Sequence, residues 1–305
     1  MQNDLMISVS GVRGIVGRSL TPELLVRLGH AFATYMQRGR VVVGRDTRVS
    51  GEMAKHAVLG GVLAGGCEVI DAGVCATPTL TLLVENLKAD GGIMVTASHN
   101  PIEWNALKFF RGDGMYLNAE ESRELLNIYY SGAFSLAAWN ELKPARHAPT
   151  PEVHHVKRVL SILDCDLIRS RQFRVALDCC NGAGCGVAMQ LLRELNCRIE
   201  PIHSTPDGLF PHKPEPVAAN LQELCSHVAR TAADAVQPST VISRPPDLPR
   251  QEKPAPKYRW EQVEGPAVSL PSGRDPGELR GIGGVNSPGL SELARFGRLS
   301  PHRRH

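Results

Sequence analysis

Residues 92–110 read GIMVTASHNPIEWNALKFF, and they place a polar loop between two apolar segments. Gly92 to Val95 and Ala106 to Phe110 are short and apolar, as expected of buried strands. The residues between them, TASHNPIEWN, are polar and turn-forming. A loop held between two buried strands is a usual place for functional residues, so this loop is the first candidate for a site.

Short strands and amphipathic helices alternate on the N-terminal side of this loop. Residues 40–44 (RVVVG) predict a buried strand. Thr21 predicts an N-cap, because a proline and a glutamate follow it at the first helical positions. Ser50 and Thr77 are predicted to cap two further helices in the same way. This order of elements predicts a sheet covered by helices, with a domain spanning residues 1–145.

A second unit of the same kind is predicted over residues 150–235, with a strand, a tight turn, a helix and a strand at residues 173–178, 179–184, 185–195 and 198–202. A further helix, predicted over residues 218–233, should be followed by another strand. The residues that come next, VQPS at 236–239, do not continue the pattern. We therefore expect an α/β fold with two three-layer α/β/α mixed-sheet domains, the second incomplete at its edge.

Length and composition fit a protein with two hydrophobic cores. The chain has 305 residues, of which 42% are hydrophobic. No apolar run approaches the roughly 20 residues that span a bilayer, and the first residues, MQNDLMISVSG, lack the basic region of a signal peptide. The eight cysteines show no C-x-x-C spacing, so the sequence indicates neither a zinc site nor a disulfide framework. We expect a cytoplasmic protein with no membrane partner.

Residues 236–305 have a different composition. They hold 11 of the 22 prolines and 11 Lys or Arg against 7 Asp or Glu, whereas the residues before them are close to neutral. A segment of this composition buries too little apolar surface to fold, so we expect a tail with little structure. Its three aromatic residues, Tyr258, Trp260 and Phe296, are not interleaved with basic residues as a nucleic-acid surface requires. Nucleic acid is therefore not an expected partner.

Four segments together resemble the α-D-phosphohexomutase family of phosphoglucomutases, phosphomannomutases and phosphoglucosamine mutases. They are SGVRG at residues 10–14, GRDTRVSG at 44–51, TASHNP at 96–101 followed by Lys108, and DCCNGAG at 178–184. A Ser-His pair alone would be a weak signal, but the whole hexapeptide together with the other segments is specific. The resemblance extends to about residue 233 and corresponds to the first domain and most of the second in these enzymes.

The resemblance implies a phosphohexose mutase, an isomerase of the phosphotransferase type. Ser98 would be a phosphoserine that gives its phosphoryl group to a hexose phosphate and takes another back from the bisphosphate. A sugar bisphosphate would serve as activator, and the sequence variants are most similar to those of phosphoglucosamine mutases. Because phosphoryl transfer needs positive charge around the moving group, His99, Lys108 and Arg13 are the remaining catalytic candidates.

The segment GRDTRVSG leaves two interpretations open. Arg45, Asp46 and Arg48 could contact the loop of Ser98, or they could form an ion pair that stays within a strand-to-helix turn. The glycine-rich segment at residues 181–184 is interpreted as a structural turn, because Val187 stands where a dinucleotide-binding motif has its third small residue.

The same resemblance implies Mg²⁺, bound by an oxygen of phosphorylated Ser98 and by three aspartates of a D-x-D-x-D-R loop. The sequence contains no such loop. The nearest match, residues 164–166 (DCD), lacks the third aspartate and is predicted to lie at a helix end. The expected metal site therefore consists of Ser98 without its protein partners, and a single phosphate would hold Mg²⁺ weakly.

We accordingly expect a phosphohexomutase that is inactive as this truncated chain. One explanation is that the reading frame was lost near codon 234, which would make the tail unrelated to the family. The other is a genuine two-domain protein with an acquired basic tail that binds acidic partners or RNA. The alternative function is therefore a non-catalytic fragment or an interaction protein.

Overall fold

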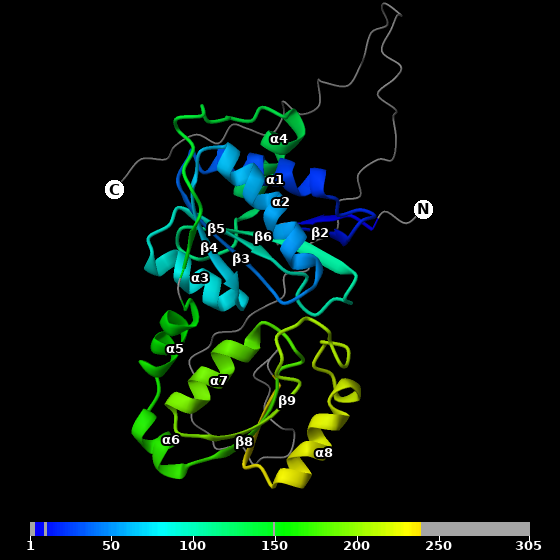
Figure 1. Ribbon diagram of the computed structural model, residues 1–305, viewed down its shortest axis with the longest axis vertical. Coiled ribbons are helices and arrows are strands. Elements are labelled where there is room, and N and C mark those ends of the chain that lie inside the picture. Colours follow the sequence, from blue (N-terminus) through cyan, green and yellow to red (C-terminus); the bar gives the residue numbers. More distant parts are fainter. Residues whose placement is uncertain (1–3, 9–10, 149, 239–305) are drawn as a thin grey trace, which may run out of the picture. The chain divides into compact units, whose positions relative to one another are not determined.

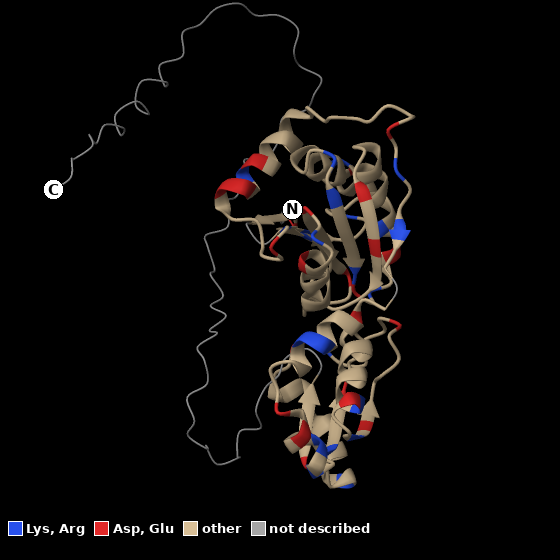
Figure 2. Ribbon diagram, turned by 90° about the vertical axis from the view of Figure 1, so that its left-hand side faces the viewer, with Lys and Arg blue, Asp and Glu red and all other residues tan. Residues whose placement is uncertain are grey.

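The computed structural model describes residues 4–8, 11–148 and 150–238 (Figure 1). Ser10 of the SGVRG segment and the predicted tail from residue 239 onward lie outside the described residues. Basic and acidic residues are interspersed along the described chain, in agreement with its near-neutral composition (Figure 2). None of the helices in the described ranges has the length and apolar character needed to cross a membrane.

The first sheet has seven strands, in the spatial order β1-β2-β6-β5-β3-β4-β7. Strands β3, β4 and β5 run parallel, and β6 pairs antiparallel with both β5 and β2. The sheet is therefore mixed, as predicted. The strand bounds are Met6–Ser8 (β1), Gly11–Ile15 (β2), Arg40–Arg45 (β3), Glu68–Val74 (β4), Gly91–Val95 (β5), Trp104–Arg111 (β6) and Arg146–His147 (β7).

Helices cover both faces of this sheet. Strand β3 shows the layering, since Val41 and Val43 pack in the cluster with α1, α2 and α4, whereas Val42 packs with α3. All three valines are fully buried. Because successive side chains of a strand point to opposite faces, a run of buried valines requires a cover on each side. The helices are Pro22–Tyr35 (α1), Ser50–Ala64 (α2), Thr77–Asn86 (α3) and Ala119–Ser131 (α4).

One of the three predicted helix caps is confirmed and two are wrong. The hydroxyl of Thr21 accepts a hydrogen bond from the backbone N–H of Leu24 at the start of α1. Ser50 and Thr77 are instead the first residues of α2 and α3, and neither helix has a side-chain cap. The hydroxyl of Ser50 accepts from the side-chain amide of Asn105 in β6, so it serves a tertiary contact that a local sequence pattern does not reveal.

The second sheet has three parallel strands in the order β10-β8-β9. Helix α7 packs on the face formed by Leu177 and Ile199, and Figure 1 shows α8 on the other side of the sheet. The elements are Glu152–Leu160 (α5), Cys165–Arg171 (α6), Arg174–Asp178 (β8), Gly184–Glu194 (α7), Arg198–Ile202 (β9), a 3-10 turn at Ala218–Asn220, Gln222–Thr231 (α8) and Ala235–Pro238 (β10). Asp164 caps α6 through its side chain, which confirms that the DCD segment is a helix-end feature.

The prediction that no strand follows the last helix was wrong. Strand β10 pairs in parallel with β8, from Ala235 opposite Val175 to Pro238 opposite Asp178. The sequence concealed this strand because a proline cannot donate a ladder hydrogen bond and usually argues against a strand. Pro238 is the last residue of the strand, where the missing N–H costs little. The second sheet therefore has an edge strand, β10, that the sequence did not lead us to expect.

Candidate active site

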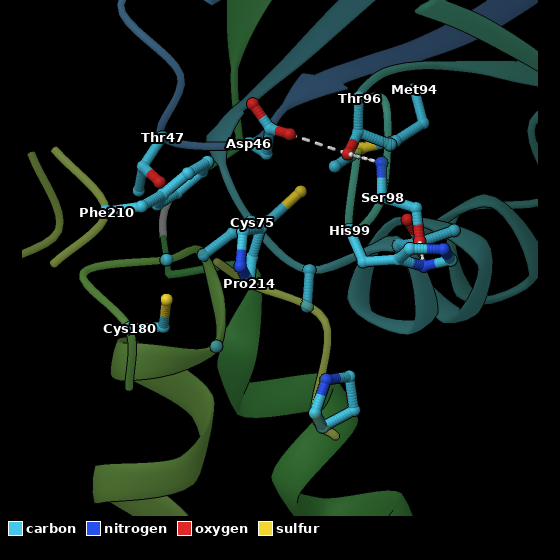
Figure 3. A pocket seen from close by; sticks show the side chains of 16 residues that line it. Asp46, Thr47, Cys75, Met94, Thr96, Ser98, His99, Cys180, Phe210 and Pro214 are labelled. Carbon is cyan, nitrogen blue, oxygen red and sulfur yellow. Dashed lines mark hydrogen bonds between the residues drawn. The ribbon is translucent and has the colours of Figure 1, made fainter. Parts of the chain in front are cut away.

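Ser98 lies just beyond the end of β5, with its side chain exposed. Its backbone is in the left-handed region at φ 57°, which is uncommon for a residue with a Cβ. Its N–H donates to the hydroxyl of Thr96 at 3.1 Å, and its own hydroxyl lies 3.3 Å from Nδ1 of the exposed His99 (Figure 3). The loop thus presents the serine hydroxyl to solvent beside an imidazole.

The fully buried side chain of Arg48 holds the loop of Ser98 in place. The guanidinium donates to four backbone carbonyl oxygens of the loop, those of Ser98 (3.0 Å), Asn100 (2.7 Å), Pro101 (2.7 Å) and Trp104 (3.1 Å). A guanidinium has five N–H donors in a rigid plane, so one side chain can satisfy several carbonyls at once. These bonds fix the backbone that carries the serine.

Asp46 completes this arrangement. Its carboxylate accepts from Nε of Arg48 at 3.1 Å and from the hydroxyl of Thr96 at 2.6 Å. Burial raises the pKa of Asp46 and lowers the pKa of Arg48, and the attraction between the two charges opposes both shifts. For Asp46 and Arg48 both interpretations of the GRDTRVSG segment hold, because the internal ion pair and the contact with the loop coexist. Arg45 instead forms an ion pair with Glu52 of α2.

Ser98 and His99 line a pocket with a volume of about 370 Å³. Its wall combines residues of the first sheet's loops with residues that follow β8 and β9 (Figure 3). The hydroxyl of Thr47, on this wall, is buried and has no hydrogen-bond partner within the described residues. A buried polar atom without a partner is costly, and a ligand in the pocket could supply one. The other lining residues are Asp46, Cys75, Ala76, Thr77, Met94, Thr96, Cys180, Gly182, Ala183, Gly184, Phe210, Pro214 and Pro216.

Two contacts bring the loop after β9 to this wall. The ring of Phe210 lies 5.1 Å from the guanidinium carbon of Arg48, within the range of a cation–π interaction. Gly208 has φ +74°, and a Cβ at this position would lie 2.0 Å from the carbonyl oxygen of Thr47. Glycine is required here both by the backbone conformation and by the close approach.

Lys108 and Arg13 lie on neighbouring strands, β6 and β2. Burial lowers the pKa of the half-buried Lys108, Arg13 lowers it further, and Asp46 raises it. Arg13 is exposed, and its Nε contacts the sulfur of Met6 at 3.2 Å. Within the described ranges neither side chain lines the pocket or hydrogen-bonds Ser98. The structure therefore brings His99 to the serine and groups Lys108 with Arg13 and Asp46.

The described residues do not form the Mg²⁺ site that the resemblance implies. Mg²⁺ requires several oxygen ligands in octahedral geometry. The carboxylate of Asp46 is already engaged by Arg48 and Thr96. Among the described residues, Asp178, His203 and His212 form a group that could hold a metal ion, and it contains two imidazoles. The donors around Ser98 thus do not suit Mg²⁺.

Sequence reasoning missed Thr47 and Phe210, and it left the position of Arg48 undecided. The Pro-Asp-Gly turn at residues 206–208, followed by an aromatic residue, was the available signal for Phe210. For Thr47 the signal was its place between Asp46 and Arg48. Neither signal predicts a pocket, because the pocket forms only when the loop after β9 reaches the turn after β3.

The family models of known proteins match most of the described chain. Residues 5–135 match phosphoglucomutase/phosphomannomutase, alpha/beta/alpha domain I, and residues 153–239 match domain II of the same proteins. The chain belongs to the phosphoglucomutase/phosphomannomutase family. Its two sheets, the first mixed and the second parallel over the described residues, alternate with helices and agree with the two matched domains of these phosphohexomutases.

Individual relatives agree with this family membership. The chain is 40% identical over 230 residues to the "Phosphoglucomutase/phosphomannomutase" of Thermococcus kodakarensis, which covers 73% of this chain and 50% of the relative. It is 41% identical over 226 residues to the "Probable phosphoglucosamine mutase" of Methanopyrus kandleri, covering 74% and 49% of the two chains. The chain thus spans about half the length of the curated relatives it matches.

A solved structure supports the fold. The chain resembles a phosphoglucomutase/phosphomannomutase family protein from Burkholderia thailandensis with a TM-score of 0.63 and 25% sequence identity. The similarity covers 75% of this chain and 52% of that one.

Proposed function

We propose that this chain is the phosphoserine-bearing part of a phosphohexose mutase, with Ser98 as the residue that carries the phosphoryl group. The observation that supports this most strongly is the loop itself. An exposed serine hydroxyl stands at a pocket, on a backbone that Arg48 fixes through four carbonyl oxygens. Fixing the nucleophile removes much of the entropic cost of aligning it with a phosphate.

In the proposed step the oxygen of Ser98 attacks a phosphorus atom of a hexose bisphosphate. The new bond joins the serine oxygen to phosphorus, and the bond between that phosphorus and the sugar oxygen breaks. The serine hydroxyl loses its proton, and the released sugar oxygen gains one. Nδ1 of His99, at 3.3 Å from the serine hydroxyl, is positioned to take the first proton.

The cationic side chains have different places in this proposal. A phosphoserine carries about −1.5 to −2 charge, so its loop benefits from nearby positive charge. His99 lines the pocket, whereas Lys108 on β6 and Arg13 on β2 are not among its lining residues. We assign Lys108 and Arg13 to long-range stabilisation of the anion, and we assign the Thr47 hydroxyl to a direct hydrogen bond with the bound phosphate.

We further propose that the chain alone accepts a phosphoryl group but does not complete the isomerisation. Complete turnover would need the phosphorylated sugar to turn around and meet groups that select it. The sequence lacks the aspartate-rich loop of the family, and the described donors around Ser98 do not suit Mg²⁺. Isomerase activity, a bisphosphate activator and a hexose phosphate substrate are parts of the same proposal.

Incubation of the purified chain with glucose 1,6-bisphosphate tests the first part of the proposal. Mass spectrometry should find one added phosphate on the peptide that contains Ser98. Ser98→Gly should abolish it, because glycine removes the hydroxyl and suits the left-handed backbone. Ser161→Gly, which alters another exposed serine, should leave phosphate uptake intact. A chain that stays unphosphorylated while it remains folded would rule out the carrier role.

A second assay addresses turnover and the sugar. The phosphorylated chain is supplied with Mg²⁺ and with the 1-phosphates of glucosamine, glucose or mannose. We propose glucosamine phosphate as the sugar class, because several relatives bear the name "Probable phosphoglucosamine mutase". We expect no sustained formation of 6-phosphate, whereas many turnovers per chain would show that the aspartate loop is dispensable here.

A further inference from the structure

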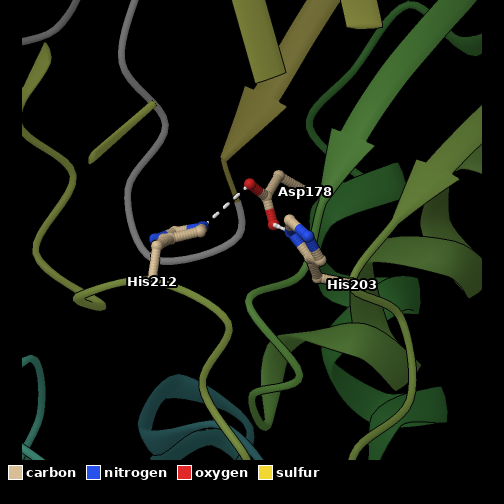
Figure 4. A group of neighbouring side chains, drawn as sticks. All are labelled: Asp178, His203 and His212. Carbon is tan, nitrogen blue, oxygen red and sulfur yellow. Dashed lines mark hydrogen bonds and ion pairs between the residues drawn. The ribbon is translucent and has the colours of Figure 1, made fainter. Parts of the chain in front are cut away.

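Asp178, His203 and His212 form a cluster in the second sheet unit that the phosphoserine chemistry does not use (Figure 4). Asp178 ends β8 and is only 1% exposed. One carboxylate oxygen lies 3.1 Å from Nδ1 of His203, and the other lies 3.0 Å from Nε2 of His212. One atom from each residue lies within 4.8 Å of the other two.

The outer nitrogen of each imidazole also faces an acceptor. Nδ1 of His212 lies 2.9 Å from the carbonyl oxygen of Lys213, to which it must donate. Nε2 of His203 lies 3.4 Å from the carboxylate of Glu223. Metal-binding histidines in proteins are oriented in this way, by a carbonyl or carboxylate that accepts from the nitrogen opposite the metal.

The inner nitrogens, Nδ1 of His203 and Nε2 of His212, both face the carboxylate of Asp178, so nitrogen and oxygen ligands converge on one place. The backbone N–H of Cys180 also donates to Asp178 at 2.9 Å and holds the carboxylate in place.

We propose that Asp178, His203 and His212 bind a divalent transition metal ion of the Zn²⁺ class. Two imidazole nitrogens and one carboxylate are a ligand set typical of such ions, which leaves room for water or a substrate oxygen. Mg²⁺ prefers oxygen ligands and is disfavoured by this set. The site is separate from the Mg²⁺ site that the family resemblance implies at Ser98.

The position of the cluster suggests what a bound ion does. Its ligands come from the end of β8, from the residue after β9 and from the loop that carries Phe210. Phe210 stacks on Arg48, and Pro214 and Pro216 of the same loop line the pocket of Ser98. An ion held by the three residues would fasten this loop to the sheet and stabilise the wall of the pocket.

The metal-free 305-residue chain, prepared with a chelator, is titrated with Co²⁺ and then with Zn²⁺. Co²⁺ should give the visible absorption of a four- or five-coordinate ion at one equivalent per chain, and Zn²⁺ should abolish it. His203→Ala and His212→Ala should each weaken Co²⁺ binding more than 100-fold, beyond the ~10–100-fold typical of an outer-shell change. Zn²⁺ should also raise the midpoint of thermal unfolding, because it binds the folded state.

Two further variants separate metal binding from effects on folding. The side chain of Glu223 is 66% exposed, so Glu223→Gln leaves the packing intact and should weaken Co²⁺ binding about 10-fold. His56→Ala removes an exposed histidine that also lies near a carboxylate, that of Glu52 at 3.4 Å, and should change nothing. Unaltered binding in both His203→Ala and His212→Ala, no visible spectrum, or a sulfur-to-cobalt charge-transfer band from cysteine binding would each overturn the proposal.

Discussion

Nη2 of Arg48 donates a hydrogen bond to the carbonyl oxygen of Ser98 at 3.0 Å. This bond joins the turn after β3 to the loop after β5, which are neighbouring parallel strands. The carboxyl ends of parallel strands meet at one edge of a sheet, and loops at that edge commonly form binding sites. The contact therefore makes the position of the candidate nucleophile depend on a buried residue that never reaches the pocket.

Arg48→Lys should destabilise the chain and misplace the loop. Lysine keeps the charge but has a single donor nitrogen, so several carbonyl oxygens of the loop would lose their partner. We expect the free energy of unfolding to fall by about 3 kcal/mol, since the group is fully buried. Urea unfolding measures this change, and phosphate uptake at Ser98 should fall with it.

Arg18→Lys alters an arginine that is 62% exposed and should lower the free energy of unfolding by less than about 1 kcal/mol. Equal losses in the two variants would contradict the proposed role of Arg48.

Much of the fold could be predicted because its signals are local. The strand at residues 40–44 is a run of valines, and buried strands in parallel sheets have this composition. The helix after Thr21 follows from the cap and the proline beside it. Strand β10 was missed because Pro238 resembles a strand breaker, although parallel pairing with β8 accommodates it as the last residue.

The candidate site was only partly predictable, for a different reason. Ser98 and His99 are adjacent in sequence, and the hexapeptide that contains them marks the loop. The contact of Phe210 with Arg48 joins distant segments, and no local pattern encodes it. The cluster that we propose as a metal site was missed for the same reason, since Asp178, His203 and His212 meet only in the folded chain.

Lys108→Met should change how stability depends on pH. Burial lowers the pKa of Lys108, with a further contribution from Arg13. Between this lowered pKa and the ordinary value of 10.5, the unfolded chain binds more protons than the folded chain, so Lys108 makes stability rise with pH. Methionine avoids the cost of burying the charge, and we expect the variant to be more stable than the parent chain at pH 7.

The advantage of the methionine variant should shrink as the pH rises from the lowered pKa through 10.5, above which the lysine is neutral in both states. Urea unfolding of the two chains at a series of pH values measures this difference. Lys157→Met, at an exposed position on α5, should give a difference that stays flat over the same range. If the difference in free energy of unfolding between Lys108→Met and the parent chain widens with pH, burial of the charge is not its cause.

Cys75 should resist alkylation although it lines the pocket. Burial raises the pKa of its thiol to about 12, so very little reactive thiolate exists at neutral pH. Cys225 is exposed on α8 and should react much faster with iodoacetamide. Peptide mass spectrometry at timed intervals compares the two residues in one sample. If Cys75 is modified as fast as Cys225 while the chain remains folded, the wall of the pocket opens more than the structure shows.

Gly208→Ala tests the close approach between the loop after β9 and the turn after β3. Its matched control is Gly17→Ala, because both glycines have φ +74°. An alanine at either position bears the strain of a left-handed backbone, about 1 kcal/mol.

Only at Gly208 would the new Cβ also meet a backbone atom, the carbonyl oxygen of Thr47 at 2.0 Å, whereas Gly17 has open space around it. Overpacking of this kind costs about 1–3 kcal/mol, so Gly208→Ala should lower the free energy of unfolding by that amount beyond Gly17→Ala. Hydrogen exchange should report where the effect falls, with faster exchange at Thr47 and Arg48 in the Gly208 variant alone. Equal stability and unchanged exchange in both variants would mean that the loop does not rest against Thr47 in solution, and the pocket would then lose one of its walls.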